Sequence, residues 1–224
     1  MREVWLVMRN HYEEQLKKLN EYVAEMGELI EKAISDALDA LMHKDIEEAK
    51  NTINYDNQID HMEREIEGLC LNLLLSQQPV ATDLRMVSAA LKMVTDMERI
   101  GDHAADISEI TLVLAKNGYP DSLAQIQKMA EETMKMVNKS VEAYLDEDMQ
   151  KASEVIRQDD VVDNYFIQVK TDIIRQINEN IQNGEQAADV LMIAKYLERI
   201  GDHATNIAEW VLFYLTGEHP DVAE

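Results

Sequence analysis

Apolar residues recur along this 224-residue chain at alternating steps of three and four. The clearest run is Ile59, Met62, Ile66, Leu69 and Leu73, which places all its members on one face of an α-helix but on both faces of a strand. The same spacing predicts six long helices, near residues 10–43, 46–76, 82–116, 121–145, 148–182 and 186–216. The three prolines, Pro79, Pro120 and Pro220, fall where a helix is expected to start or stop.

The chain contains an internal duplication. The stretch Glu98-Arg99-Ile100-Gly101-Asp102-His103-Ala104 recurs without change at 198–204, an offset of 100. An earlier block repeats with an offset of 103, since Asp45, Ala49, Asp56 and Asp60 correspond to Asp148, Ala152, Asp159 and Asp163. The two offsets differ by three, which predicts a shorter link in the second copy, at Asn183-Gly184 in place of Ser76-Gln77-Gln78-Pro79.

Three long amphipathic helices in each copy, joined by short links, predict an all-α fold of two tandem three-helix bundles. Successive helices would run antiparallel. The boundary between the repeats is expected at Asn117-Gly118-Tyr119-Pro120, which gives one domain at 1–117 and a second at 118–224.

Charge restricts the choice of partner. Asp and Glu number 44 against 21 Lys and Arg, so the formal net charge is −23. Nucleic acid is excluded as a partner because its phosphates would be repelled, and free phosphate and anionic lipid are disfavoured for the same reason. Cations and basic protein surfaces are the expected partners.

The chain is expected to be cytoplasmic. Its single cysteine, Cys70, lies in an apolar stretch and is predicted to be an inert buried thiol, as in a reducing compartment. No apolar run approaches the ~20 residues of a membrane span, so direct membrane insertion is not expected. The segment Val4-Trp5-Leu6-Val7-Met8 is too short for a signal-peptide core.

Carboxylates four residues apart stack along one face of a helix. The candidate metal ligands in the first copy are Asp56, Asp60, Glu98, Asp102 and Asp106, and those in the second are Asp159, Asp163, Glu198 and Asp202. These acids flank the apolar seams and would line a groove at the edge of each bundle. Oxygen ligands suit hard ions such as iron, manganese, magnesium or calcium, and zinc less well. In so acidic a chain one such pair is more often a solvated face, but its repetition in both copies favours metal binding.

Two further features accompany these acids. Gly101 and Gly201 each cost a helix interior about 1 kcal/mol relative to alanine, which indicates close approach of another helix or of a bound cluster. His103 and His203 lie about 140° around the helix from Glu98 and Glu198, so a structural or supporting role is favoured over direct ligation.

The duplicated motif, the Asp-x-x-x-Asp pairs and the stretch Gln78-Pro79-Val80-Ala81-Thr82-Asp83-Leu84-Arg85 together resemble the PhoU family over most of the chain. Met8-Arg9 resembles the usual start of the family, so Met8 is a second candidate initiator. The resemblance implies multinuclear metal clusters, with iron, zinc, manganese or magnesium as candidate ions, on the nine acids named above. It also implies restraint of phosphate uptake and of phosphate-starvation signalling when phosphate is plentiful. The implied partners are the ATPase subunit of the phosphate ABC transporter and a sensor histidine kinase, which would hold the protein at the inner face of the membrane.

Other interpretations stay open. A carboxylate-bridged dimetal enzyme of the ferritin-like kind would use Glu-x-x-His pairs, but Gly101 and Gly201 occupy the histidine positions after Glu98 and Glu198. The sequence shows no nucleophile–base constellation or phosphate-binding glycine loop, so a non-enzymatic regulator is favoured. A metal-free acidic scaffold would explain the duplication but not the paired acids. A homodimer is compatible with the sequence, although no residue decides it.

Overall fold

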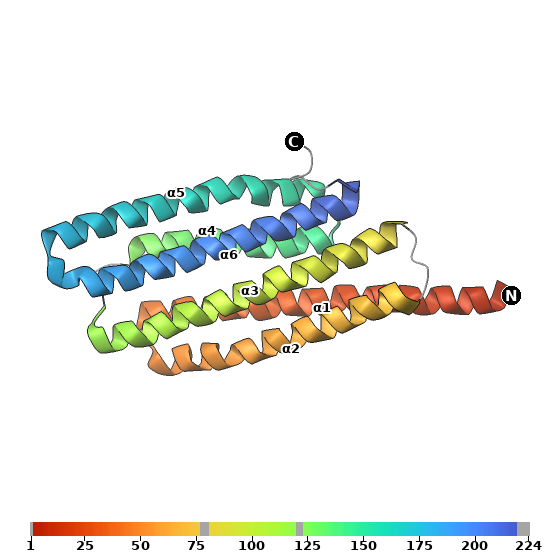
Figure 1. Cartoon of the computed structure of the whole chain (residues 1–224), viewed down its shortest axis with the longest axis horizontal. Coiled ribbons are helices and arrows are strands. Elements are labelled where there is room, and N and C mark those ends of the chain that lie inside the picture. The colour runs from red at the N-terminus through yellow and green to blue at the C-terminus, as the bar shows by residue number, and fades with distance from the viewer. Residues whose placement is uncertain (1, 77–80, 120–122, 219–224) are drawn as a thin grey trace.

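The computed structural model describes residues 2–76, 81–119 and 123–218, and this part of the chain is all-α. Its helices are α1 (Arg2–His43), α2 (Ile46–Ser76), α3 (Ala81–Asn117), α4 (Ala124–Leu145), α5 (Met149–Glu179) and α6 (Gly184–Thr216), with a short 3-10 turn η1 (Ile181–Asn183) before α6 (Figure 1). The predicted fold class and six helices are confirmed. The three prolines lie outside the described residues, as do the predicted link residues 77–79.

Two helix boundaries differ from the prediction. Helix α1 begins at Arg2 rather than near residue 10, because the apolar spacing continues back from Tyr12 through Met8 and Trp5, two further turns. Gly184, expected in a link, is the first residue of α6. The chain reverses just before it, where Asn180 Oδ1 accepts a hydrogen bond from the Gln182 backbone N–H at 3.1 Å.

The helices form two bundles, α1–α3 and α4–α6, as predicted. In each bundle every helix packs on the other two, and the bundles meet chiefly where α3 lies along α6, with a smaller contact between α1 and α4 (Figure 1). Residues 117 and 118 mark the end of α3, and the exact division of the chain there stays a prediction.

The duplicated Asp45 and Asp148 are helix caps. Asp45 Oδ1 accepts from the backbone N–H groups of Glu47 and Glu48 at 3.0 and 3.1 Å, and Asp148 Oδ1 accepts equivalent bonds at the start of α5. The residues before these caps, Lys44 and Glu147, both have positive φ, at 59° and 53°. The same turn thus joins the first two helices of each repeat, because the capping carboxylate satisfies N–H groups that the helix leaves unpaired.

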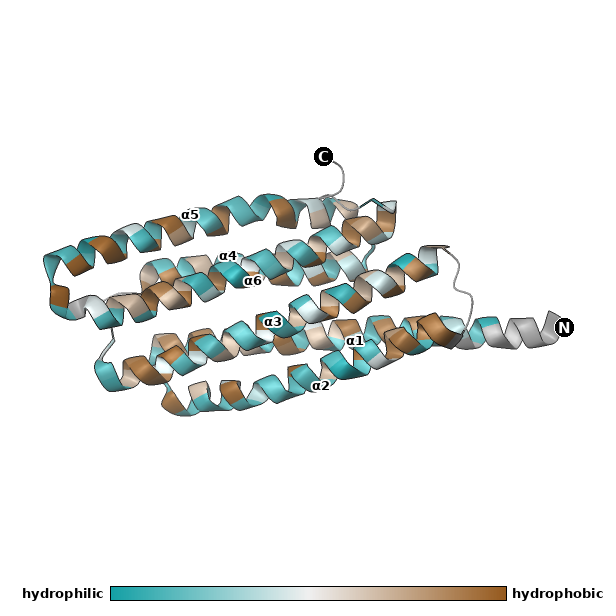
Figure 2. Ribbon diagram, in the orientation of Figure 1, coloured by the Kyte–Doolittle hydropathy of each residue, from teal (hydrophilic) through white to brown (hydrophobic). Residues whose placement is uncertain are grey.

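The core follows the helical seam. Apolar and polar positions alternate along every helix rather than separating into apolar and polar helices (Figure 2). The predicted apolar side of α3 is fully buried and so is its copy in α6; these residues are Met93, Met97, Ile100 and Ala104, then Ile193, Leu197, Ile200 and Ala204. The α3–α6 pair therefore forms the spine on which the other helices pack.

The first helices of the two repeats differ in length. Val23 and Met26 of α1 correspond to Ile126 and Met129 of α4 at the offset of 103, and all four are buried. Residues 2–20 of α1 have no counterpart, because α4 begins only at Ala124. Helices α5 and α6 consequently continue past α4 (Figure 1), and beside the start of α4 lies a cavity of about 300 Å³ lined by side chains that include Ile126, Val169, Ile173 and Val190.

Two sequence expectations concern single features. Cys70 is buried, and this burial raises the pKa of its thiol to about 12, as expected for an inert residue. No helix of the described residues has an apolar stretch suited to crossing a membrane.

Candidate metal grooves between paired helices

The acids predicted to line a groove in the first bundle lie on two packed helices, with Asp56 and Asp60 on α2 and Glu98, Asp102 and Asp106 on α3, and this set is named the first groove. Gly101 brings the two helices close together at its centre. A Cβ added at Gly101 would lie 2.7 Å from Ile59 Cδ1 and 3.1 Å from Asp56 Oδ1, so only glycine leaves room for this acid against the α3 backbone. Of the two explanations expected for this glycine, close approach of a helix is therefore observed.

The five acids form one electrostatic cluster. Burial, followed by the charges of Asp102, Asp60, Glu98 and Asp106, raises the pKa of Asp56 to about 6. The pKa of Glu98 is also raised, first by burial and then by Asp102, while Arg99 partly opposes the shift. The ionised forms of Asp56 and Glu98 are thus disfavoured by burial and by neighbouring negative charges, and a bound cation would relieve this cost.

Two buried oxygens of the first groove lack hydrogen-bond partners. They are Asp56 Oδ1 and Glu98 Oε2. Glu98 Oε2 has only an ion pair with Arg99 Nε at 3.5 Å, and the outer acids have closer partners. Asp60 Oδ2 lies 2.9 Å from Arg64 Nη2, and Asp102 Oδ2 lies 2.7 Å from Arg99 Nη1. Asp106 Oδ2 is 3.3 Å from His103 Nδ1. Buried acceptors without donors are rare and need an explanation, and a cation between α2 and α3 fits them.

The arrangement is not a closed metal cage. Among the residues that the structure describes, no three His, Cys, Asp or Glu side chains converge closely enough to hold one ion. The inner pair, Asp56 and Glu98, is available, whereas Asp60 and Asp102 would have to leave their arginines to join it. Exposed ion pairs of this kind contribute only about 0–1 kcal/mol, so this exchange is a small obstacle.

The second groove comprises Asp159 and Asp163 on α5 with Glu198 and Asp202 on α6. Burial, then Asp163 and Asp202, raises the pKa of Asp159 to about 6, as for Asp56. The helices are less tightly apposed, since a Cβ at Gly201 would lie 3.5 Å from Val162 Cγ1 and 3.6 Å from Asp159 Oδ1. Glu198 forms an ion pair with Lys195, a residue that the sequence analysis did not single out.

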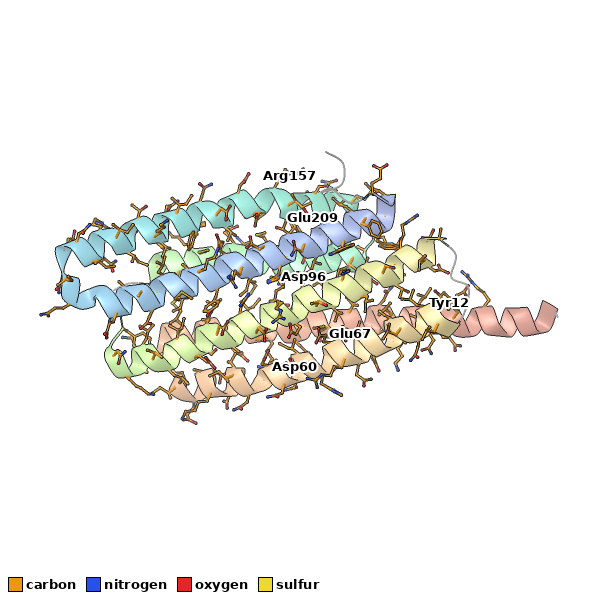
Figure 3. The ribbon with its side chains drawn as sticks, in the orientation of Figure 1. Tyr12, Asp60, Glu67, Asp96, Arg157 and Glu209 are labelled. Carbon is orange, nitrogen blue, oxygen red and sulfur yellow. The ribbon has the colours of Figure 1, made fainter. Side chains whose placement is uncertain are left out.

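A polar cluster that the sequence did not reveal joins the two bundles. Asp96 lies between α3 and α6 (Figure 3), where its Oδ1 atom is 2.8 Å from His203 Nδ1 and accepts a hydrogen bond from Asn206 Nδ2 at 3.0 Å. The ring of His103 stacks on that of Tyr196 at 5.3 Å. Asn206, which replaces the third acid of the motif, and both histidines thus lie at the inter-bundle contact. The one sequence signal was the mismatch of Asp96 with Tyr196 at equivalent positions of the repeat.

The two glycines predict opposite responses to alanine. Gly201→Ala is expected to stabilise the protein by up to about 1 kcal/mol, because the methyl group makes ordinary contacts and alanine favours the helix. Gly101→Ala is expected to lose that gain and destabilise, because Ile59 and Asp56 must move. Urea unfolding of both variants measures the difference, which should be roughly 2 kcal/mol. Equal effects would show that the tight packing at Gly101 is not maintained in solution.

The fold and the repeated groove define the class: a duplicated three-helix protein with an Asp/Glu groove in each copy. The sequence model of the PhoU domain matches residues 23–111 and again residues 126–211. This chain belongs to the PhoU family.

Full-length relatives agree with this assignment. A protein of Clostridium acetobutylicum named "Phosphate-specific transport system accessory protein PhoU homolog" is 35% identical over 215 residues, covering 96% of this chain and 98% of its own. The crystal structure of PhoU from Pseudomonas aeruginosa has a TM-score of 0.89 at 31% identity, covering 92% of this chain and 100% of that one. The crystal structure of the phosphate transport system regulatory protein PhoU from Streptococcus pneumoniae has a TM-score of 0.85 at 30% identity, covering 93% of this chain and 98% of that one.

Proposed function

We propose that this protein is a non-enzymatic accessory protein of phosphate-specific transport. It would restrain phosphate uptake and phosphate-starvation signalling when phosphate is plentiful. The observation that carries the proposal is the likeness to proteins named for that system, which extends over nearly the whole of both chains. The partners proposed are the ATPase subunit of the phosphate transporter and a sensor histidine kinase.

The charge of the chain supports action by protein contact. A net charge of −23 favours docking on basic protein surfaces and speeds the encounter with them. The same charge disfavours a direct approach to anionic lipid, so association with the inner face of the membrane would come through the partners. On this proposal the protein works in the cytoplasm.

We further propose that the first groove holds a divalent or trivalent metal ion. Asp56 and Glu98 would supply the inner oxygens, and Asp60, Asp102 and Asp106 are placed to complete the shell. All-oxygen ligation suits iron, manganese or magnesium better than zinc. When bound, the ion supplies positive charge that links α2 to α3 across their like-charged faces.

The decisive experiment is recovery of the native complex from phosphate-replete cells, with elemental analysis of the same eluate. The expected result is co-purification of the transporter ATPase together with a bound transition metal. A preparation that carries metal but neither the ATPase nor a histidine kinase would contradict the regulatory proposal and favour the dimetal enzyme. A preparation that carries the ATPase but no metal would contradict the metal site alone.

A further inference from the structure

The two grooves, although built from the same motif, carry different charge. The acids of the first groove and its flanks on α2 and α3 are Asp56, Asp60, Glu63, Glu67, Glu98, Asp102 and Asp106, accompanied by Arg64 and Arg99. At the equivalent positions of the second repeat only four acids remain, Asp159, Asp163, Glu198 and Asp202, accompanied by Lys170 and Arg199 and joined by Lys195. The three lost acids, Glu63, Glu67 and Asp106, are replaced by Phe166, Lys170 and Asn206.

Lys195 brings a cation to the second groove. It takes the position of exposed Thr95 in the first repeat, and its ammonium group pairs with Glu198. The same nitrogen lies 5.5 Å from the ring centroid of Phe166, within the range of a cation–π contact. Phe166 in turn takes the position of Glu63, whose charge acts on Glu98 in the first groove. The two replacements therefore act together. The ring of Phe166 contacts the ammonium group that pairs with Glu198, whereas the first repeat has the carboxylate of Glu63 at the position of that ring.

The counterpart of Glu198, Glu98, shares its cationic partner Arg99 with a second acid, Asp102. Glu98 Oε2 is buried without a hydrogen bond, and the nearest cationic atom recorded for it, Arg99 Nε, is 3.5 Å away. Arg99 directs its Nη1 atom to Asp102 instead. The first groove thus has unsatisfied carboxylate oxygens, whereas in the second the corresponding glutamate is already neutralised.

We infer that Lys195 is the built-in counter-ion of the second groove and that only the first groove takes a metal ion. The inference rests on the proposed metal site of the first groove. An ammonium group beside Glu198 repels an incoming cation and occupies the carboxylate that the ion needs, and at such short range this repulsion is strong. The duplication would then have produced one metal-dependent helix pair and one that keeps its geometry without metal.

The counter-ion role is tested first on metal-free protein. Lys195→Thr places the residue of the first repeat in the second groove and is expected to lower Tm by about 2 °C, because Glu198 loses its partner. Thr95→Lys makes the reverse exchange and is expected to raise Tm by a similar amount. Lys92→Thr, on an exposed position of α3, is the control for net charge and should leave Tm nearly unchanged. The inference would be overturned, whether or not any metal binds, if Tm did not change in the first two variants or if Lys92→Thr lowered Tm as much as Lys195→Thr does.

Equilibrium dialysis with Mn²⁺ then tests the assignment of the metal. Binding by the natural sequence should fall sharply in Asp56→Asn and persist in Asp159→Asn, and Thr95→Lys should weaken it roughly tenfold or more. The double variant Lys195→Thr with Phe166→Glu restores both first-repeat residues and should gain a second class of sites, which Asp159→Asn removes. Circular dichroism checks the fold of each variant.

The possible failures are distinct. If Asp159→Asn reduces Mn²⁺ binding as much as Asp56→Asn does, both grooves bind metal, and the inference is wrong while the proposed first site stands. If the natural sequence binds no Mn²⁺, iron or zinc and the metal-free shifts appear as expected, the proposed metal site fails and the counter-ion role of Lys195 is supported.

Discussion

Asp56→Asn is expected to stabilise the metal-free protein and to remove most of the further stabilisation that a metal ion gives. The pKa of Asp56 is raised to about 6, so at pH 7 its ionised form costs the folded state free energy that the neutral amide does not. Allowing for partial exposure to solvent, this cost is about 1 kcal/mol, or roughly 2–4 °C in Tm. The sign follows from the upward shift: stability associated with this acid is present below its unfolded pKa and is lost as pH rises through 6.

The response to metal should change in the opposite direction. A metal ion present at about 100 times its Kd would stabilise the natural sequence by about 2.7 kcal/mol, a rise of roughly 5–10 °C in Tm. Asp56→Asn should lose most of that rise, because it removes the charge at the centre of the first groove. Thermal unfolding with and without Mn²⁺ measures both effects in one series.

Asp159→Asn is the matched control for this experiment. Burial and neighbouring acids raise the pKa of the Asp159 carboxyl to about 6, as for Asp56. In metal-free protein, Asp159→Asn should therefore raise Tm as much as Asp56→Asn does. Its response to Mn²⁺ should match that of the natural sequence, since the second groove is neutralised internally. A full metal response in Asp56→Asn would show that the ion binds elsewhere.

Leu19→Ala is expected to destabilise the protein by about 3 kcal/mol. The side chain is fully buried, and removing it leaves a cavity as well as the loss of apolar burial. Leu19 lies in the part of α1 that has no counterpart in the second repeat, where Tyr12 is also buried (Figure 3). The result would show that this additional length of helix is part of the core of the first bundle. Urea unfolding followed by circular dichroism gives the free energy.

Leu75→Ala provides the comparison, because Leu75 is 84% exposed and its loss should change the unfolding free energy by less than about 0.5 kcal/mol. A Leu19→Ala variant as stable as the natural sequence would mean that α1 is not packed into the bundle around Leu19 in solution.

The sequence was sufficient for the fold because its signals are local or repeated. The three–four seam through Ile59 and Ile66 identifies a helix whatever it packs against, and both residues are buried as expected. The identical motifs at 98–104 and 198–204 identify a duplication without any structure. The acids of the first groove could be grouped for the same reason, since four-residue spacing alone places Glu98 and Asp102 on one face. Whether they bind metal stays a prediction.

Contacts between the bundles could not be predicted in this way. The pairing of Asp96 with His203 depends on which faces of α3 and α6 meet, and spacing within one helix carries no information about that. The ion pair of Lys195 with Glu198 was not predicted, because only the acids that the two repeats share pointed to a site. Positions where the copies differ, such as Thr95 and Lys195, proved to be as informative as those where they agree.

The unequal lengths of α1 and α4 have a consequence for how the protein opens. Helix α1 reaches the start of α3, where Arg9 Nη1 lies 3.3 Å from Asp83 Oδ2, whereas α5 and α6 continue past the start of α4, and Ile181 between them is 83% exposed (Figure 1). Local opening requires least free energy where the fewest apolar contacts must break. We therefore expect the part of the α5–α6 pair beyond α4 to open more readily than the rest of the second bundle, and a partner that binds there would order it at an entropic cost.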